Sequence, residues 1–193
     1  MAKIFHSVRL DDEKCVGCTN CIKRCPTEAI RVRNKKAYII SDRCIDCGEC
    51  IKVCPQHAKY AVMENLEETK KFRYNIALPA PALYGQFNNL ENVDYVLTGL
   101  KKMGFDKVVE VSKAAEYISS ATRRMMETDD LKRPVISTAC PAVVRLIRIR
   151  FPNLIPNLLP LYAPVDFAAR IAREEREARN SDSECIDIPM AVL

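Results

Sequence analysis

The sequence predicts two consecutive modules of different class: an α+β module followed by an α/β domain with a parallel sheet. A cysteine run at residues 15–26, CVGCTNCIKRCP, returns as CIDCGECIKVCP at residues 44–55. From residue 75 onward, short apolar runs alternate with stretches of helical period. A chain of 193 residues, 48% of them hydrophobic, is long enough for one small and one medium domain.

The two cysteine runs form an internal duplication. A shift of 29 positions superimposes their cysteines pairwise and aligns Pro26 with Pro55. Each copy reads C-x2-C-x2-C-x3-C-P, in which three thiolates hold one 4Fe-4S cluster and the fourth cysteine crosses to the other. We therefore assign cluster one to Cys15, Cys18, Cys21 and Cys54, and cluster two to Cys44, Cys47, Cys50 and Cys25. Zinc is the alternative, but a site of two cysteine pairs gives no reason for the third cysteine.

The segments around the runs predict short elements. Pro26 and Pro55 should each end a helical turn. Residues 29–41, AIRVRNKKAYIIS, predict two strands joined by a turn near Asn34 and Lys35. After the prolines the copies differ, so that apolar Ile30 corresponds to Lys59. A charge near one cluster raises the reduction potential of that cluster. We therefore expect the two clusters to have unequal midpoint potentials.

His57 lies just beyond Cys54 and could be taken for a ligand. We interpret it as an exposed turn residue, because eight cysteines already complete both clusters.

Composition limits the cellular compartment and the classes of partner that we expect for this protein. Residues 1–14, MAKIFHSVRLDDEK, lack a secretion signal, and ten cysteines in a reducing cytoplasm favour metal binding over disulfides. The formal charge of +5 would be offset by two clusters of about −2 each, and the basic residues are scattered, so we expect no nucleic-acid partner. The apolar stretch at residues 154–165 is too short for a membrane span.

The second half changes periodicity after a charged linker at residues 64–74. Strands are predicted at residues 75–81, 107–111 and 134–138, with helices between them carrying Val93 to Met103 and Ala114 to Met125 on their apolar faces. This alternation predicts a parallel sheet with crossover helices. A last helix follows from Pro164, and the apolar tail at residues 186–193 could add a strand or dock on a partner.

Cys140 follows the predicted third strand, at the sheet edge where ligands usually bind. The alternative is a small buried hydrophobic side chain, a common role for an isolated cysteine.

Two resemblances bear on these interpretations. Residues 8–62 resemble bacterial-type ferredoxins with two 4Fe-4S clusters, which implies one-electron transfer. ALPAPALYGQF (77–87), STACPAV (137–143) and residues 151–174 resemble the opening part of the iron-only hydrogenase catalytic domain, especially its sensory branch. The implied organisation is a two-cluster ferredoxin domain at 1–63, a linker at 64–74 and a partial hydrogenase-like α/β domain at 75–193.

The hydrogenase resemblance implies that Cys140 is a candidate ligand of the active-site cluster. Ala139 stands in place of the family's proton-relay cysteine, and Val143 in place of its tryptophan. The family's later cysteine motifs are absent from the sequence, and Cys185 is interpreted as an incidental thiol.

We therefore expect a hydrogenase-related iron-sulfur protein that passes single electrons to or from a partner protein or subunit and that can form an oligomer. The alternatives are an enzyme subunit or fragment whose active-site cluster is completed by absent sequence, and a redox or hydrogen sensor.

Overall fold

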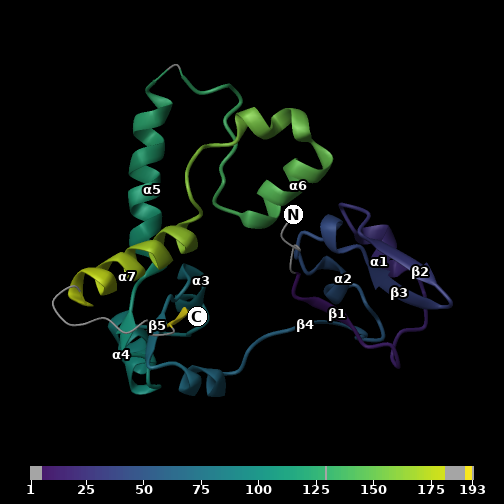
Figure 1. Ribbon diagram of the computed structural model, residues 1–193, viewed down its shortest axis with the longest axis horizontal. Coiled ribbons are helices and arrows are strands. Elements are labelled where there is room, and N and C mark those ends of the chain that lie inside the picture. The colour runs from purple at the N-terminus through teal and green to yellow at the C-terminus, as the bar shows by residue number, and fades with distance from the viewer. Residues whose placement is uncertain (1–5, 129, 181–189, 193) are drawn as a thin grey trace. The chain divides into compact units, whose positions relative to one another are not determined.

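Two small antiparallel sheets form the cysteine-rich part of the computed structural model, which describes residues 6–128, 130–180 and 190–192 (Figure 1). β1 (Val8–Leu10) pairs with β4 (Lys59–Ala61), and β2 (Ile30–Arg33) pairs with β3 (Lys36–Ile39). Asn34 and Lys35 join β2 to β3 with φ values of 49° and 60°, as a tight hairpin turn requires. The predicted hairpin and its turn are confirmed.

Short helices follow the cysteine loops. These are α1 (Asn20–Arg24) and α2 (Glu49–Lys52), while the 3-10 helix η1 (Ser41–Arg43) precedes the second loop. Both α-helices end before the prolines, as predicted. Apolar side chains from both repeats, among them Val8, Ile30 and Ala58, form a core together with cysteines of both runs.

The chain divides by its contacts into two compact units. Unit 1 comprises Met1–Glu64 and Cys140–Leu158, and unit 2 comprises Asn65–Ala139 and Leu159–Leu193. Unit 1 therefore takes in α6 (Pro141–Arg150) and the 3-10 helix η3 (Pro152–Asn157).

A parallel sheet lies at the centre of unit 2. β5 (Tyr74–Ala77) is flanked by β6 (Lys107–Val108) and β7 (Met190–Val192), and both neighbours run parallel to it. The central place of β5 agrees with its last two side chains, which are apolar: Ile76 is fully buried and Ala77 nearly so. The predicted parallel sheet is thus present.

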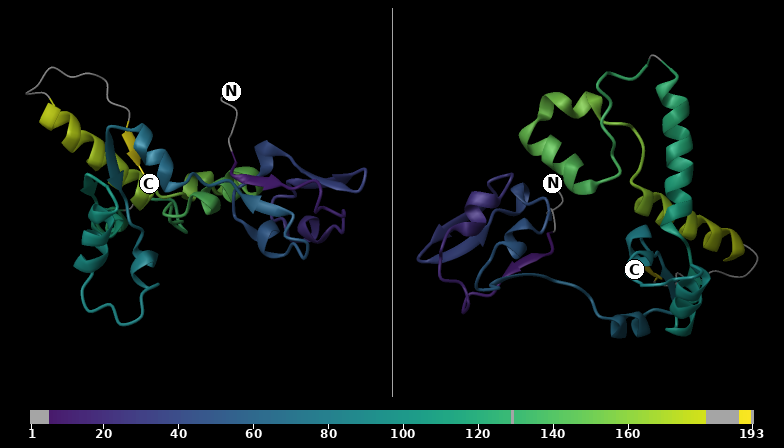
Figure 2. Two further views of the ribbon diagram at one scale, coloured as in Figure 1. Left: turned by 90° about the horizontal axis from the view of Figure 1, so that it is seen from below. Right: turned by 180° about the vertical axis from the view of Figure 1, so that it is seen from behind.

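The helices of unit 2 follow the predicted order. They are η2 (Leu66–Lys71, a 3-10 helix), α3 (Pro81–Tyr84), α4 (Asp94–Lys102), α5 (Val111–Met126) and α7 (Pro164–Asn180). In the right view of Figure 2, α7 crosses the N-terminal part of α5, and the two share a core with Ile76. None of the described helices is long and apolar enough to cross a bilayer.

The predicted third strand at residues 134–138 is wrong. Only Ile136 makes an isolated bridge there, and its carbonyl accepts a hydrogen bond from Leu159 N at 2.8 Å. Thr138 Oγ1 donates to the carbonyls of Leu159 and Leu161 rather than standing in a sheet. The third strand is β7 instead, so the apolar tail supplies it.

Candidate metal centres

The two cysteine loops share one backbone shape. Gly17 and its repeat counterpart Asp46 have φ values of 71° and 55°, and Thr19 and its counterpart Gly48 have 67° and 73°. Successive residues that alternate with this left-handed conformation turn backbone N–H groups toward a common point, where they can stabilise negative charge. Each loop is therefore shaped to surround an anionic group.

The first cavity lies in the loop of the first repeat. It is bounded by Cys15, Cys18, Cys21 and Cys54. Three of these sulfurs come from the first loop and one from the second. Apolar side chains of Leu10, Val32 and Ala37 complete the lining together with Lys59.

The second cavity lies in the loop of the second repeat. It is bounded by Cys44, Cys47, Cys50 and Cys25. Here the fourth cysteine comes from the first repeat. Each repeat therefore contributes one cysteine to the cavity of the other repeat. Val8, Ile30 and Ile39 form much of the remaining wall, and no lysine or arginine lines it.

Backbone amides hold several of the sulfurs. Ala29 N donates to Cys25 Sγ at 3.2 Å, and its repeat counterpart Ala58 N donates to Cys54 Sγ at 3.3 Å. Ala37 N, on β3, lies 3.4 Å from Cys15 Sγ. Such hydrogen bonds favour the thiolate and tune the reduction potential of a bound cluster. The equal geometry at Cys25 and Cys54 shows that the two crossing cysteines are held in the same way.

Burial opposes thiolate formation at the inner cysteines. It raises the pKa of Cys21 and Cys44, and raises the pKa of Cys50 to about 11. The positive charge of Lys59 acts in the opposite direction on the pKa of Cys21 and of Cys50. Without a metal these thiols hold their protons at neutral pH, so binding a metal cluster must release them.

The surroundings of Lys59 indicate that the first cavity suits an anionic group. Its residue is 3% exposed, and within the described chain its Nζ has no hydrogen-bond partner. A buried, unpaired ammonium is strongly destabilising. Sulfur ligands beside such a cation suit an iron-sulfur cluster, whose net charge is negative.

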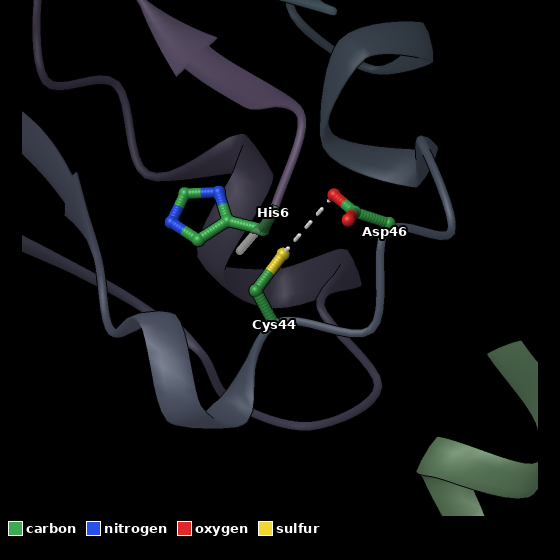
Figure 3. Close-up of side chains that lie close together, drawn as sticks. All are labelled: His6, Cys44 and Asp46. Atoms are coloured by element: carbon green, nitrogen blue, oxygen red, sulfur yellow. Dashed lines mark hydrogen bonds between the residues drawn. The ribbon is translucent and has the colours of Figure 1, made fainter. Parts of the chain in front are cut away.

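A third group of metal-binding residue types lies beside the second loop (Figure 3). His6, Cys44 and Asp46 place one ligand atom each within 4.8 Å of one another. Asp46 already accepts hydrogen bonds from the backbone N–H groups of Ser7 and Val8, at 3.0 and 3.4 Å. His6 Nε2 lies 3.2 Å from Ser41 Oγ. The group thus fastens the residues before β1 to the second loop.

Cysteine spacing alone did not reveal His6 or Asp46. The one signal available is that Asp46 stands where the first repeat has Gly17.

Comparison with known families shows to which protein family the chain belongs. A family model described as "Iron only hydrogenase large subunit, C-terminal domain" matches residues 73–188, which is more than half of the chain. The chain belongs to the iron-only hydrogenase large-subunit family. A second model, "4Fe-4S dicluster domain", matches residues 7–55. The hydrogenase-type chain therefore also carries an iron-sulfur domain.

A curated relative supports the same relationship. The Periplasmic [Fe] hydrogenase large subunit of Nitratidesulfovibrio vulgaris is 28% identical over 188 residues. The match takes in 88% of this hydrogenase-type chain and 45% of the relative, so the chain spans less than half of that relative's length. The relative's name places that protein in the periplasm, whereas the sequence led us to expect the cytoplasm.

Cys140 does not lie at the end of a sheet strand, where we expected it. Because residues 134–138 form no sheet strand, Cys140 does not follow one; it lies at the N-cap of α6, before Pro141. Its side chain is exposed, so the alternative of a buried hydrophobic residue is wrong. Cys185 lies outside the described residues.

His57 lies in an exposed turn with a φ of 48°, the position predicted for it.

Proposed function

We propose that this chain is an electron-transfer protein that carries two 4Fe-4S clusters and passes single electrons to or from a partner redox centre. The observation that carries the proposal is the pair of cavities, each bounded by three cysteines of its own repeat and one of the other. Four cysteines lining one largely apolar cavity match the number of ligands that a cubane needs. When bound, each cluster supplies one-electron transfer at low potential.

The residues of the chain would hold, insulate and expose these clusters. The eight cysteines supply the thiolates, and Ala29 and Ala58 hydrogen-bond the two crossing sulfurs. Val8 and Ile30, both 2% exposed, exclude water from the second cavity. Cys18 and Cys47, by contrast, are exposed and stand at the same position in their loops. We infer that these two sulfurs mark the points at which electrons enter and leave.

Metal analysis tests this function. Anaerobically reconstituted full-length protein should contain about eight irons and eight sulfides per chain and show EPR signals of two clusters after reduction. Cys54→Ser should remove or alter the cluster held by Cys15, Cys18 and Cys21, and leave the other intact. The matched control is Cys140→Ser, which should retain about eight irons. Colourless protein that contains only zinc would contradict the proposal.

Family membership favours a second candidate, a hydrogenase-related enzyme subunit whose active-site cluster is completed by sequence absent from this chain. Cys140 is the candidate ligand, and its exposure at the start of α6 leaves its sulfur accessible to a further group. This function predicts iron beyond the about eight atoms of the two clusters, lost in Cys140→Ala. Hydrogen-dependent reduction of a viologen dye would support it as well. If Cys140→Ala leaves the iron content unchanged and no dye is reduced, electron transfer alone remains.

A further inference from the structure

The two cavities differ most at one pair of equivalent positions. The shift that aligns the repeats superimposes Ile30 on Lys59. Ile30 begins β2 and lines the second cavity, and Lys59 begins β4 and lines the first. Both side chains are buried, at 2% and 3% exposure. The fold therefore places an isoleucine at one cavity and a lysine at the other.

Lys59 has no partner for this ammonium in the described part of the protein. A lysine Nζ offers three donors and no acceptor, so only an acceptor or an anion can satisfy it. Of the two cavities, the first is the one whose lining includes Lys59. A negative group in the first cavity is thus the natural counter-charge.

A second difference between the repeats acts in the same direction. Asp46 takes the place of Gly17 and puts a carboxylate Oδ1 3.9 Å from Cys44 Sγ, beside the second cavity. Arg145 on α6 also has a buried nitrogen, Nη2, without a hydrogen-bond partner among the described residues, but Arg145 does not line this cavity. The first cavity is therefore the more favourable place for added negative charge.

We propose that Lys59 is the internal counter-ion of cluster one and makes it the higher-potential of the two clusters. The inference rests on the proposed electron-transfer function and adds a direction to it. Reduction adds one electron, hence one negative charge, and Lys59, which lines the first cavity and not the second, stabilises that charge more at the first cavity. An electron from a low-potential one-electron donor that enters either cluster comes to reside on cluster one.

The test is a redox titration of the reconstituted full-length protein, monitored by EPR. Lys59→Met removes the charge and keeps a long apolar side chain. We expect it to weaken reduction of cluster one by about tenfold or more, which is a fall of 59 mV in a one-electron midpoint. Cys18→Ser and Cys47→Ser each alter the ligands of a single cluster, and so identify which signal belongs to which.

Two controls separate charge from packing. Lys52→Met removes an exposed lysine at the end of α2 and should leave the separation of the midpoints unchanged. Lys59→Arg keeps the charge and should keep cluster one the higher. The reciprocal variant Ile30→Lys places a cation at the second cavity and should raise the midpoint of cluster two. It tests the same electrostatic rule if Lys59→Met fails to fold.

The outcomes distinguish the inference from the function on which it rests. If the wild-type protein binds about eight irons and Lys59→Met leaves the midpoint separation unchanged, the inference is overturned and electron transfer stands. A shift confined to the signal that Cys47→Ser alters would also overturn it. If the wild-type protein binds no iron-sulfur cluster, the function itself is overturned. A fall confined to the signal that Cys18→Ser alters supports the inference.

Discussion

Gly17 and Gly48 hold the two cysteine loops in the same left-handed turns, yet they stand at different positions of the repeat. In each loop one left-handed position is glycine and the other is not: Asp46 replaces the first glycine and Thr19 the second. A side chain in this conformation costs about 1–2 kcal/mol. The two loops thus share one backbone shape, but glycine occupies a different one of the two left-handed positions in each loop.

The surroundings of these glycines predict different tolerances. A Cβ on Gly17 would lie 2.7 Å from the backbone oxygen of Lys35, whereas a Cβ on Gly48 would have nothing within 4 Å. We expect Gly48→Ala to cost about 1–2 kcal/mol from its backbone conformation alone. Gly17→Ala should cost more, because the β2–β3 turn must also move. The rate of cluster loss in guanidinium, followed by visible absorbance, measures the difference; equal rates would contradict it.

At the scale of elements, unit 2 depends on close packing of α5 and α7. Ala168 and Ala172, one helical turn apart on α7, are fully buried, and Ala114 on α5 is 2% exposed. All three belong to the core that also holds Ile76 of β5. Small side chains allow the helix backbones to approach, and Tyr117 and Phe167 meet edge to face beside them, with ring centroids 6.5 Å apart.

Larger side chains at this contact should therefore destabilise unit 2. Ala172→Leu inserts three carbon atoms where there is no space, and we expect it to lower the free energy of unfolding by about 1–3 kcal/mol. Ala178→Leu, at an exposed position of the same helix, is the matched control and should change it by less than about 0.5 kcal/mol. Denaturant unfolding followed by circular dichroism makes the comparison. Equal effects of the two variants would show that the site is not tightly packed.

At the scale of the whole molecule, the cores of the two units have different chemistry. The buried core of unit 1 includes Cys15, Cys21 and Cys50, whereas the core of unit 2 around Ile76 is built from apolar side chains and contains no cysteine among its described members. Unit 1 also includes residues 140–158, where Arg150 pairs with Glu28 at 2.8 Å and lowers the pKa of that carboxyl group. Both partners are exposed, so this pair contributes little stability.

Removal of iron should unfold unit 1 and leave unit 2 folded. Metal binding by cysteines is coupled to folding, so a chelator under anaerobic, reducing conditions should abolish the hydrogen-exchange protection of residues 6–64. β5 and α5 should keep theirs, because their core holds no cysteine. Residues 140–158 should lose protection together with residues 6–64. Simultaneous loss of protection in β5 would contradict this division.

Local patterns in the sequence were sufficient for the cysteine loops and the elements next to them. The doubled spacing, the prolines that end α1 and α2, and the turn at Asn34 and Lys35 all depend on residues a few positions apart. The helical period of α5 and α7 is equally local. Local spacing sets local backbone conformation, so these features could be predicted without knowledge of the rest of the chain.

Long-range pairing decided what remained. Residues 134–138 have the composition of a strand, but a strand needs a partner, and β5 pairs instead with the distant β6 and β7. The burial of Lys59 and the exposure of Cys140 likewise depend on what packs over them. The sequence by itself determined the iron-sulfur chemistry of the chain, because ligand type and spacing are written in consecutive residues. Only the tertiary structure decided which cavity faces a cation, because charge acts through space and not along the chain.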